Sequence, residues 1–478
     1  MKKNAKLTLA VLTLLLSSAA LSCGASVSTA EETNGTNNNT AETENVPTPA
    51  VEAQDYGGKT FNIYSINFNT NLYFTDGENG DVMNDAVWER KRLTEEYLNV
   101  NITYENNHTI QDFATDMKLA VSAGDDAYQL ALPHVMQGIS TCVLENTLTD
   151  WNTIEAVDFS REYWNQSIVD ELSIKGHAYY VRSNYIIPGP LVLYFNKSMI
   201  ADYNLENPYT LVRDGTWTLD KLISLASNIS DDVNGDGKMD MEDRYGFSSM
   251  IDYQLTGFIY SSGLSVCESK DDTLTAVLHT EKAEKLFEKI YNLTYAPYSY
   301  HYLYGQDDRA LAVTSGRVLF ATGSVGSLMG YRESTVDIGV LPYPKYEEAQ
   351  KDYKQYDLSS LMCMPASVAD PEMAGTVTDV LSFYSMTTTI PAYYDELLGS
   401  KLTRDEESVE MLDIIFNNIV YDAGMNYFGL DGSFGYYMVY ALPQVCQQPK
   451  FAFESYFERN EKGFGKTIED FMAVVADR

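Results

Sequence analysis

The sequence predicts an open α/β fold that is divided into two or more packed lobes. Between residues 59 and 133 the pattern runs strand, helix, strand, helix, strand, which is the order that builds an open sheet. The 424 residues that follow the first 54 (478 − 54) are too many for one hydrophobic core. We therefore expect at least two lobes, with ligand-binding side chains after the carboxyl ends of strands.

Each strand and helix expected in the first lobe is indicated by its own sequence pattern. Three runs alternate between apolar and polar residues or are apolar throughout, and they predict strands at 60–66, 100–104 and 128–133. Residues 84–98 predict a helix that starts near Asn84 or Asp85. Residues 110–121 keep helical spacing up to Gly124, which is placed to end that helix.

The remainder of the chain continues the same alternation. Residues 177–197 are strand-like on both sides of Pro188-Gly189-Pro190, which suits a crossover between lobes or a simple turn. Thr218 is placed to cap a helix that runs to about residue 230. Further segments predict a strand at 245–250, a strand, glycine-rich turn, short helix and strand at 316–345, an extended stretch at 357–365 and a helix at 404–420.

The N-terminus resembles a lipoprotein export signal. Three lysines precede an apolar run from residue 7 to 22, which is too short for a comfortable membrane-spanning helix. The run ends in Ala20-Leu21-Ser22-Cys23, so Cys23 is the expected site of acylation, with palmitate among the attached chains. The alternative is an ordinary cleaved signal with an incidental cysteine. Residues 24–54 contain few large apolar side chains and predict a disordered tether.

Composition limits the kinds of partner. The chain has 33 Lys and Arg against 68 Asp and Glu, a formal net charge of −35, which argues against nucleic acid and anionic lipid surfaces. It also disfavours a strongly anionic ligand. Four cysteines follow Cys23, far apart and without a CxxC pair, so we expect buried free thiols. No nucleophile elbow, HExxH helix or phosphate-binding loop is present.

The segment DVNGDGKMDMED (232–243) has the oxygen pattern of a calcium loop. The expected ligands are the side chains of Asp232, Asn234, Asp236, Asp240 and Asp243 and the carbonyl of Lys238. Two departures matter: position twelve is Asp, and a strand follows in place of a second helix. We therefore predict a structural calcium clip between a helix and a strand. The alternative is a solvated Asp/Gly turn that holds no metal.

Five segments, in order, resemble the carbohydrate-type extracellular solute-binding lipoproteins of ABC importers. They are NDAVWERKRLTEEYLNV (84–100), YFNKSMIADYNLENPYTLVRDGTWTLDKL (194–222), DVNGDGKMDMEDRYGF (232–247), GVLPYPKY (339–346) and PAYYDELLGSKLTRDEESVEMLDII (391–415). The resemblance implies a two-lobed periplasmic-binding-protein-like fold (type II) with a hinged interlobe cleft. The lobes would be 55–187 plus 358–398 and 188–357 plus 399–478, with crossings near 185–190 and 352–358.

Position along this fold selects candidate ligand-binding residues. Asn67, Asn69 and Tyr73 follow the first strand, and His134 follows the third. Tyr185 lies at the crossing, Asp252 and Tyr253 follow a second-lobe strand, and Ser324 lies in a turn whose backbone amides could meet an oxygen. The resemblance adds Tyr427 and Phe428. Flat rings with a polar edge suit sugars, but any single Tyr is more often a packing residue.

The expected function is therefore capture of a small neutral sugar, or an oligosaccharide, and its delivery to ABC permease subunits by a lipid-anchored monomer. This places the protein on the extracytoplasmic face of a bacterial cell membrane, with no catalytic activity. A secreted carbohydrate-active enzyme is the first alternative, since paired carboxylates are everywhere in so acidic a chain. A receptor or peptide-binding module on the same fold is the second.

Overall fold

The computed structural model describes residues 48–67, 70–305, 314–331, 334–399, 405–430 and 434–478. Within it Pro49–Arg478 form one compact unit. The signal segment with Cys23, most of the tether and Asn69 lie outside the described residues, so their predictions stay untested. Among the helices that are described, none combines the length and apolarity needed to cross a membrane.

The first sheet has three parallel strands in the order β2-β1-β3. Its strands are β1 (Lys59–Ile66), β2 (Val100–His108) and β3 (Leu130–Leu132), and its helices are α2 (Val82–Leu98) and α3 (Phe113–Ala123). The three predicted strands and both helices are confirmed. Gly124 ends α3 in the left-handed conformation, with φ 64°, as its place in the sequence predicted.

The predicted start of α2 is wrong. The helix begins at Val82, because the Asp81 carboxylate accepts a hydrogen bond from the Asn84 backbone N–H at 3.0 Å and caps it. Val82 is exposed, so apolar periodicity does not mark the first turn. The side chains of Asn84 and Asp85, which were expected to mark the start of the helix, bind the loop before it.

The second sheet has six strands in the order β11-β4-β10-β6-β5, with β9 paired to β6. Its strands are β4 (Leu191–Asn196), β5 (Ser230–Asp231), β6 (Arg244–Met250), β9 (Ser299–Tyr302), β10 (Val318–Ser324) and β11 (Ile338–Leu341). Strands β6, β9 and β10 are parallel, whereas β4 is antiparallel to β10. The carboxyl ends of three strands and the start of β4 therefore share one edge.

Short helices pack around the second sheet. They include α6 (Lys197–Asp202), α7 (Pro208–Arg213), α8 (Leu219–Ala226), α9 (Thr256–Ser261), α10 (Glu281–Thr294), α12 (Val325–Leu328) and α15 (Glu406–Phe416). Thr218 caps α8 by accepting from the Lys221 N–H at 3.3 Å, which confirms the predicted cap. The strand at 245–250, the strand–helix–strand order of 316–345 and the helix within 404–420 are confirmed as well.

Three chain segments lie side by side where the predicted crossings fall. Pro190 and Asp357 form an antiparallel bridge, and the two-residue strand β12 (Gln355–Tyr356) pairs in parallel with β13 (Ile419–Val420). The predicted strand over 177–187 is wrong, since this stretch makes only isolated bridges such as Val181 with Met362. The proposed lobe boundaries remain a prediction.

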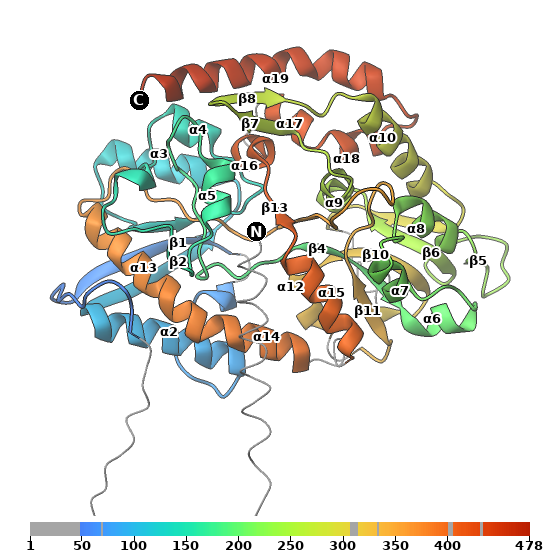
Figure 1. Cartoon of the computed structure of the whole chain (residues 1–478), viewed down its shortest axis with the longest axis horizontal. Helices are drawn as coiled ribbons and strands as arrows, with labels where there is room; N and C mark the ends of the chain where they lie inside the picture. The colour runs from blue at the N-terminus through green and yellow to red at the C-terminus, as the bar shows by residue number, and fades with distance from the viewer. Residues whose placement is uncertain (1–47, 68–69, 306–313, 332–333, 400–404, 431–433) are drawn as a thin grey trace, which may run out of the picture. The chain divides into compact units, whose positions relative to one another are not determined.

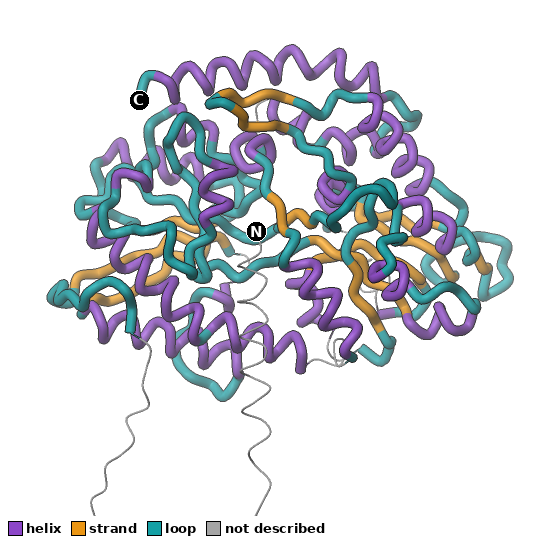
Figure 2. Tube along the Cα trace, viewed as in Figure 1, coloured by secondary structure: helices purple, strands orange, loops and turns teal. Residues whose placement is uncertain are grey.

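The remaining helices cover both sheets. They are α4 (Ser140–Leu144), α5 (Gln166–Leu172), α13 (Pro371–Thr387), α14 (Thr389–Gly399), α16 (Ala423–Phe428), α17 (Phe434–Val439), α18 (Ala441–Cys446) and α19 (Phe453–Ala476). Figure 1 shows α2 and α13 packed together beside the first sheet, and α19 above α17 and the hairpin of β7 (Cys267–Lys270) and β8 (Thr273–Ala276). Figure 2 shows that long loops join these elements. Cys142, Cys267, Cys363 and Cys446 are buried free thiols, as expected.

Gly246 offers a direct test of the packing of α8 on β6. A Cβ on this residue would lie 1.8 Å from the carbonyl oxygen of Ala226, a backbone atom that cannot move aside. We expect Gly246→Ala to lower the free energy of unfolding by about 3 kcal/mol in urea denaturation. Gly465→Ala is the control, because that glycine lies in α19 with open space around it and the change there should stabilise. Equal effects of the two changes would contradict this packing.

Candidate functional site

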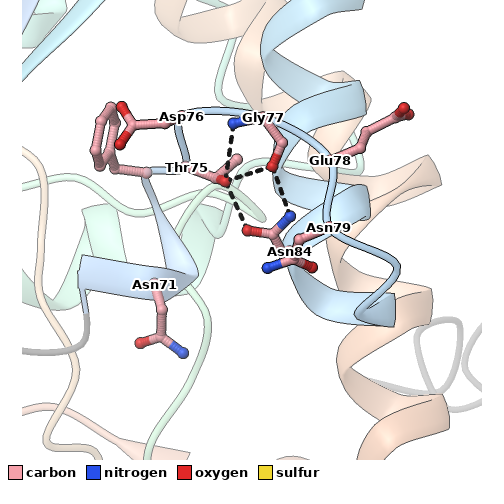
Figure 3. Close-up of a pocket in the computed structure, with 8 residues that line it drawn as sticks. Asn71, Thr75, Asp76, Gly77, Glu78, Asn79 and Asn84 are labelled. Atoms are coloured by element: carbon pink, nitrogen blue, oxygen red, sulfur yellow. Dashed lines mark hydrogen bonds between the residues drawn. The ribbon is translucent and has the colours of Figure 1, made fainter.

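A hollow of about 490 Å³ opens directly after β1 (Figure 3). Its lining comes from the loop that joins the 3-10 turn Thr70–Leu72 to α2. The lining residues are Asn71, Phe74, Thr75, Asp76, Gly77, Glu78, Asn79 and Asn84. This position agrees with the rule that ligands of open α/β sheets collect at the carboxyl ends of strands.

Hydrogen bonds hold the loop in one shape. The Thr75 hydroxyl donates to Asn84 Oδ1 at 2.6 Å, and Asn84 Nδ2 donates to the Gly77 carbonyl at 2.7 Å. The Asp85 carboxylate accepts from the Asn79 backbone N–H at 2.9 Å. These bonds, shown in part in Figure 3, fix the rim of the hollow before any ligand arrives.

Three polar side chains at the rim are left without a partner. Within the described residues, Asn71, Asp76 and Glu78 make no side-chain hydrogen bond or ion pair. Figure 3 shows Asp76 and Glu78 projecting on opposite sides of the Thr75–Asn84 contact. Phe74 also lines the hollow, and its ring lies 5.1 Å from the Tyr104 ring. An aromatic face next to free amide and carboxylate groups suits a hydroxyl-rich ring.

Two predicted residues, Tyr73 and Tyr185, lie together behind the hollow. Their ring centroids are 5.8 Å apart, and both side chains are buried. Arg90 lies over the Tyr185 ring at 4.5 Å and donates to the Tyr73 carbonyl at 3.0 Å. Burial raises the pKa of Tyr73 to about 12, so its phenol stays neutral. The pair is therefore a buried packing contact, and Tyr73 directly precedes Phe74 of the lining.

The carboxylate of Asp357 joins the crossing segments. It is fully buried and forms an ion pair with Arg182. It also accepts from the Tyr421 hydroxyl at 2.7 Å, the Ser359 hydroxyl at 2.7 Å and the Gly189 backbone N–H at 2.8 Å. One side chain thus holds together the three segments that contain residues 189, 357 and 421.

His134 lies beside the segment that contains Asp357 and Ser360. It bridges to Ser360, and its Nδ1 accepts from the Met136 backbone N–H at 3.2 Å. Burial lowers the pKa of His134 to about 4, although the charge of Asp357 acts in the opposite direction. His134 is therefore neutral near pH 7 and acts as a hydrogen-bonding group.

Three other predicted residues share the edge of the second sheet. Asp252 and Tyr253 follow β6, and Ser324 ends β10 beside the start of β4, where the Val325 N–H donates to the Pro190 carbonyl at 2.9 Å. Burial raises the pKa of the Asp252 carboxyl. Ser324 also accepts from the hydroxyl of Tyr194 through its carbonyl.

Sequence reasoning missed Tyr304 at this edge. Its ring lies 6.2 Å from that of Tyr253, and 64% of the residue is exposed. It follows β9, which was not predicted as a strand, although the alternation in SYHYLY (299–304) is the signal that could have found it.

One apolar cluster joins the two sides of the site. Leu72, next to the hollow, and Tyr253, next to Asp252, both pack against one cluster of buried apolar side chains. Those side chains include Met83 of α2 and Tyr302 of β9. The ends of both sheets therefore meet around this cluster.

Comparison with solved structures identifies the fold. The galacto-N-biose/lacto-N-biose I-binding protein of *Bifidobacterium longum* superposes with a TM-score of 0.61 at 13% identity, covering 87% of this chain and 99% of that one. The GacH receptor of *Streptomyces glaucescens* gives 0.59 at 13% identity, covering 86% and 99%. The substrate-binding protein Lmo0181 of *Listeria monocytogenes* gives 0.58 at 13%, covering 85% and 99%.

The chain has the type II periplasmic-binding-protein fold. No protein-family model matches the sequence, and no curated protein is similar to it in sequence. The predicted fold class is therefore confirmed from structure. Identities of 13% mean that the shared feature is the fold.

The last three predicted residues lie apart from the hollow in this type II fold. Tyr427 and Phe428 are fully buried in α16, and both rings pack against Phe471 of α19. The Tyr427 hydroxyl donates to the Leu172 carbonyl at 2.7 Å. Asn67 is exposed, and its backbone N–H donates to the His108 carbonyl at 2.8 Å. Their ligand roles stay predictions.

The predicted calcium loop follows β5 and leads into β6. Gly237, at position six, has φ 80°, as the sharp turn of such a loop requires. The Asp232 carboxylate accepts from the Gly237 N–H at 2.8 Å, and the Asp243 carboxylate accepts from the Val233 N–H at 2.8 Å. In the part of the chain the structure describes, no three His, Cys, Asp or Glu side chains converge as a metal site.

The Asp357 network generates a stability prediction. Asp357→Asn leaves Arg182 buried without a counter-charge, so we expect the free energy of unfolding to fall by about 3 kcal/mol or more. The double variant Arg182→Met/Asp357→Asn should lose less than the sum of the single changes in urea denaturation. Asp470→Asn, at an exposed pair with Lys466, is the control and should leave the midpoint unchanged. Strict additivity would show that the pair does not act as a unit.

Proposed function

We propose that this protein is the solute-binding component of an ABC importer, which captures a neutral mono- or oligosaccharide and passes it to the permease subunits. The observation that carries the proposal is the hollow after β1, with Phe74 beside unpaired groups of Asn71 and Asp76. Closure of two lobes around the ligand would favour the bound state.

The structural neighbours support this proposal by what they bind. The *Bifidobacterium longum* protein was solved with lacto-N-biose and belongs to an ABC transporter. The *Streptomyces glaucescens* receptor was solved with acarbose, and the *Listeria monocytogenes* protein with cycloalternan. All three are saccharide complexes on the same fold, which makes a saccharide the first ligand class to test.

A binding role without catalysis fits the side chains at the hollow. The neighbours are transport proteins, which favours a protein that is not an enzyme. The rim offers hydrogen-bonding groups, while His134 is buried and lies on the crossing-segment side. Acylation at Cys23 would hold the protein on the outer face of the cell membrane as a monomer, and a sensing role on the same fold remains the second candidate.

Saccharide binding can be measured directly. We expect one or more neutral saccharides to raise the melting temperature of the purified chain, because a ligand that binds only the folded state stabilises it. Chromatography after overnight incubation should recover the sugar intact. Consumption of the sugar would favour the enzyme, and stabilisation by peptides alone would favour the peptide-binding module.

We also propose that the loop 232–243 binds a structural calcium ion. Its oxygen pattern and the turn at Gly237 support this. Calcium would relieve the repulsion among the four Asp carboxylates predicted as ligands, out of five carboxylates in these twelve residues, and would link β5 to β6.

Calcium at 10 mM should raise the melting temperature, and a chelator should reverse the rise, because extracellular sites bind with about 10⁻⁴ to 10⁻³ M affinity. Asp236→Asn should abolish the effect, since it removes a predicted ligand. Glu242→Gln is the matched control, because residue 242 falls between two ligand positions. A melting temperature that changes neither with calcium nor with the chelator would reject the site.

A further inference from the structure

The charges around the hollow are of one sign. Of its eight lining residues, Asp76 and Glu78 are acidic and none is Lys or Arg. Neither carboxylate takes part in an ion pair or side-chain hydrogen bond among the described residues. Both groups are thus available to a ligand, and none of the described lining residues would neutralise an anionic one.

The two nearby arginines cannot supply that charge. Arg90 is fully buried and is held by the Tyr73 carbonyl and the Tyr185 ring. Arg182 is committed to Asp357. Among the residues that the structure describes, a carboxylate or phosphate on a ligand would therefore meet Asp76 without a free guanidinium to balance it.

The edge of the second sheet, on the other side of the apolar cluster around Met83 and Tyr302, also carries an acidic residue. Asp252 follows β6 next to Tyr253, which packs on the cluster that also contacts Leu72. No described ion pair includes Asp252, and its surroundings are the phenols of Tyr436 and Tyr440. In the described part of the chain, both sheet ends thus present a carboxylate without a basic partner.

We propose that the hollow selects a saccharide that carries a protonated amine, with Asp76 as the accepting group and Phe74 as the surface for the sugar ring. The loop bonds through Asn84 position both residues before binding. Charge-assisted hydrogen bonds are about twice as strong as neutral ones, so the amine distinguishes this ligand from its hydroxyl analogue. The inference rests on the proposed function and narrows its ligand class.

The test compares sugars that share one backbone and differ only in their substituents. Isothermal titration of the full chain would use four β-1,4-linked disaccharides: cellobiose, its diamino analogue, the N-acetylated form of that analogue and cellobiuronic acid. The matching monosaccharides form a second series. At low salt we expect the amine to bind about tenfold more tightly than the neutral forms, and the acid not to bind. At 0.5 M NaCl the advantage of the amine should shrink, while neutral binding stays constant.

Variants separate local selection from overall charge. Asp76→Asn should remove the preference for the amine and leave neutral binding nearly intact. Asp125→Asn removes an exposed carboxylate after α3 and should change neither. Neutral sugars that bind as tightly as amines would overturn the charge selection and leave the proposed function standing. Binding by none of the probes in either series would overturn both, and an amine preference that survives Asp76→Asn would overturn the assignment to Asp76.

Discussion

The buried carboxylate of Asp357 is the constraint on which the rest of the molecule depends. A charge without exposure to water is costly unless it is paired and its lone pairs are filled. Here Arg182 supplies the pair, and donors from residues 189, 359 and 421 fill the oxygens. Because these donors come from distant parts of the chain, the carboxylate is satisfied only when the three segments lie in register.

The same segment also shapes the first sheet. After Asp357 the chain runs beside β3: the Val135 N–H donates to the Ser359 carbonyl at 3.1 Å, and the Leu361 N–H donates to the Pro133 carbonyl at 3.1 Å. His134 is held against Ser360 by this pairing. The carboxyl end of β3 therefore depends on the segment that Asp357 anchors, so crossing and site are parts of one hydrogen-bonded unit.

Helices and strands could be predicted from the sequence where burial leaves a recognisable pattern of apolar residues. Helix α8 repeats in step with one buried face and is capped by Thr218, whereas β1 and β6 are runs of mostly buried residues. The hollow could not be predicted in this way, because its rim is a loop whose shape comes from side-chain to backbone bonds of Thr75 and Asn84. An asparagine such as Asn84 can cap a helix or hold a loop, and its identity in the sequence does not distinguish the two roles.

The tyrosines show a second limit of prediction from the sequence, because their exposure could not be predicted. Position along the chain predicts ligand contacts for Tyr73 and Tyr185, and the family resemblance predicts one for Tyr427, but all three are buried. Tyr304 is exposed at the sheet edge, although it belongs to a tyrosine-rich stretch that reads equally well as packing. Exposure is a property of the folded chain, and composition alone does not determine it.

Local charge, and not the net charge of −35, decides what such a site can hold. Exposed charges more than about 10 Å apart are largely screened at 0.1 M salt, so the acidic surface mainly affects how fast a ligand arrives. A carboxylate in direct contact with the ligand acts at hydrogen-bond distance, where screening is weak. Asp76 would meet that condition in the proposed site, whereas the guanidinium groups of Arg90 and Arg182 are directed to the Tyr73 carbonyl and to Asp357. These two buried arginines therefore contribute to the packing of the fold, while the carboxylate of Asp76 remains at the opening of the hollow.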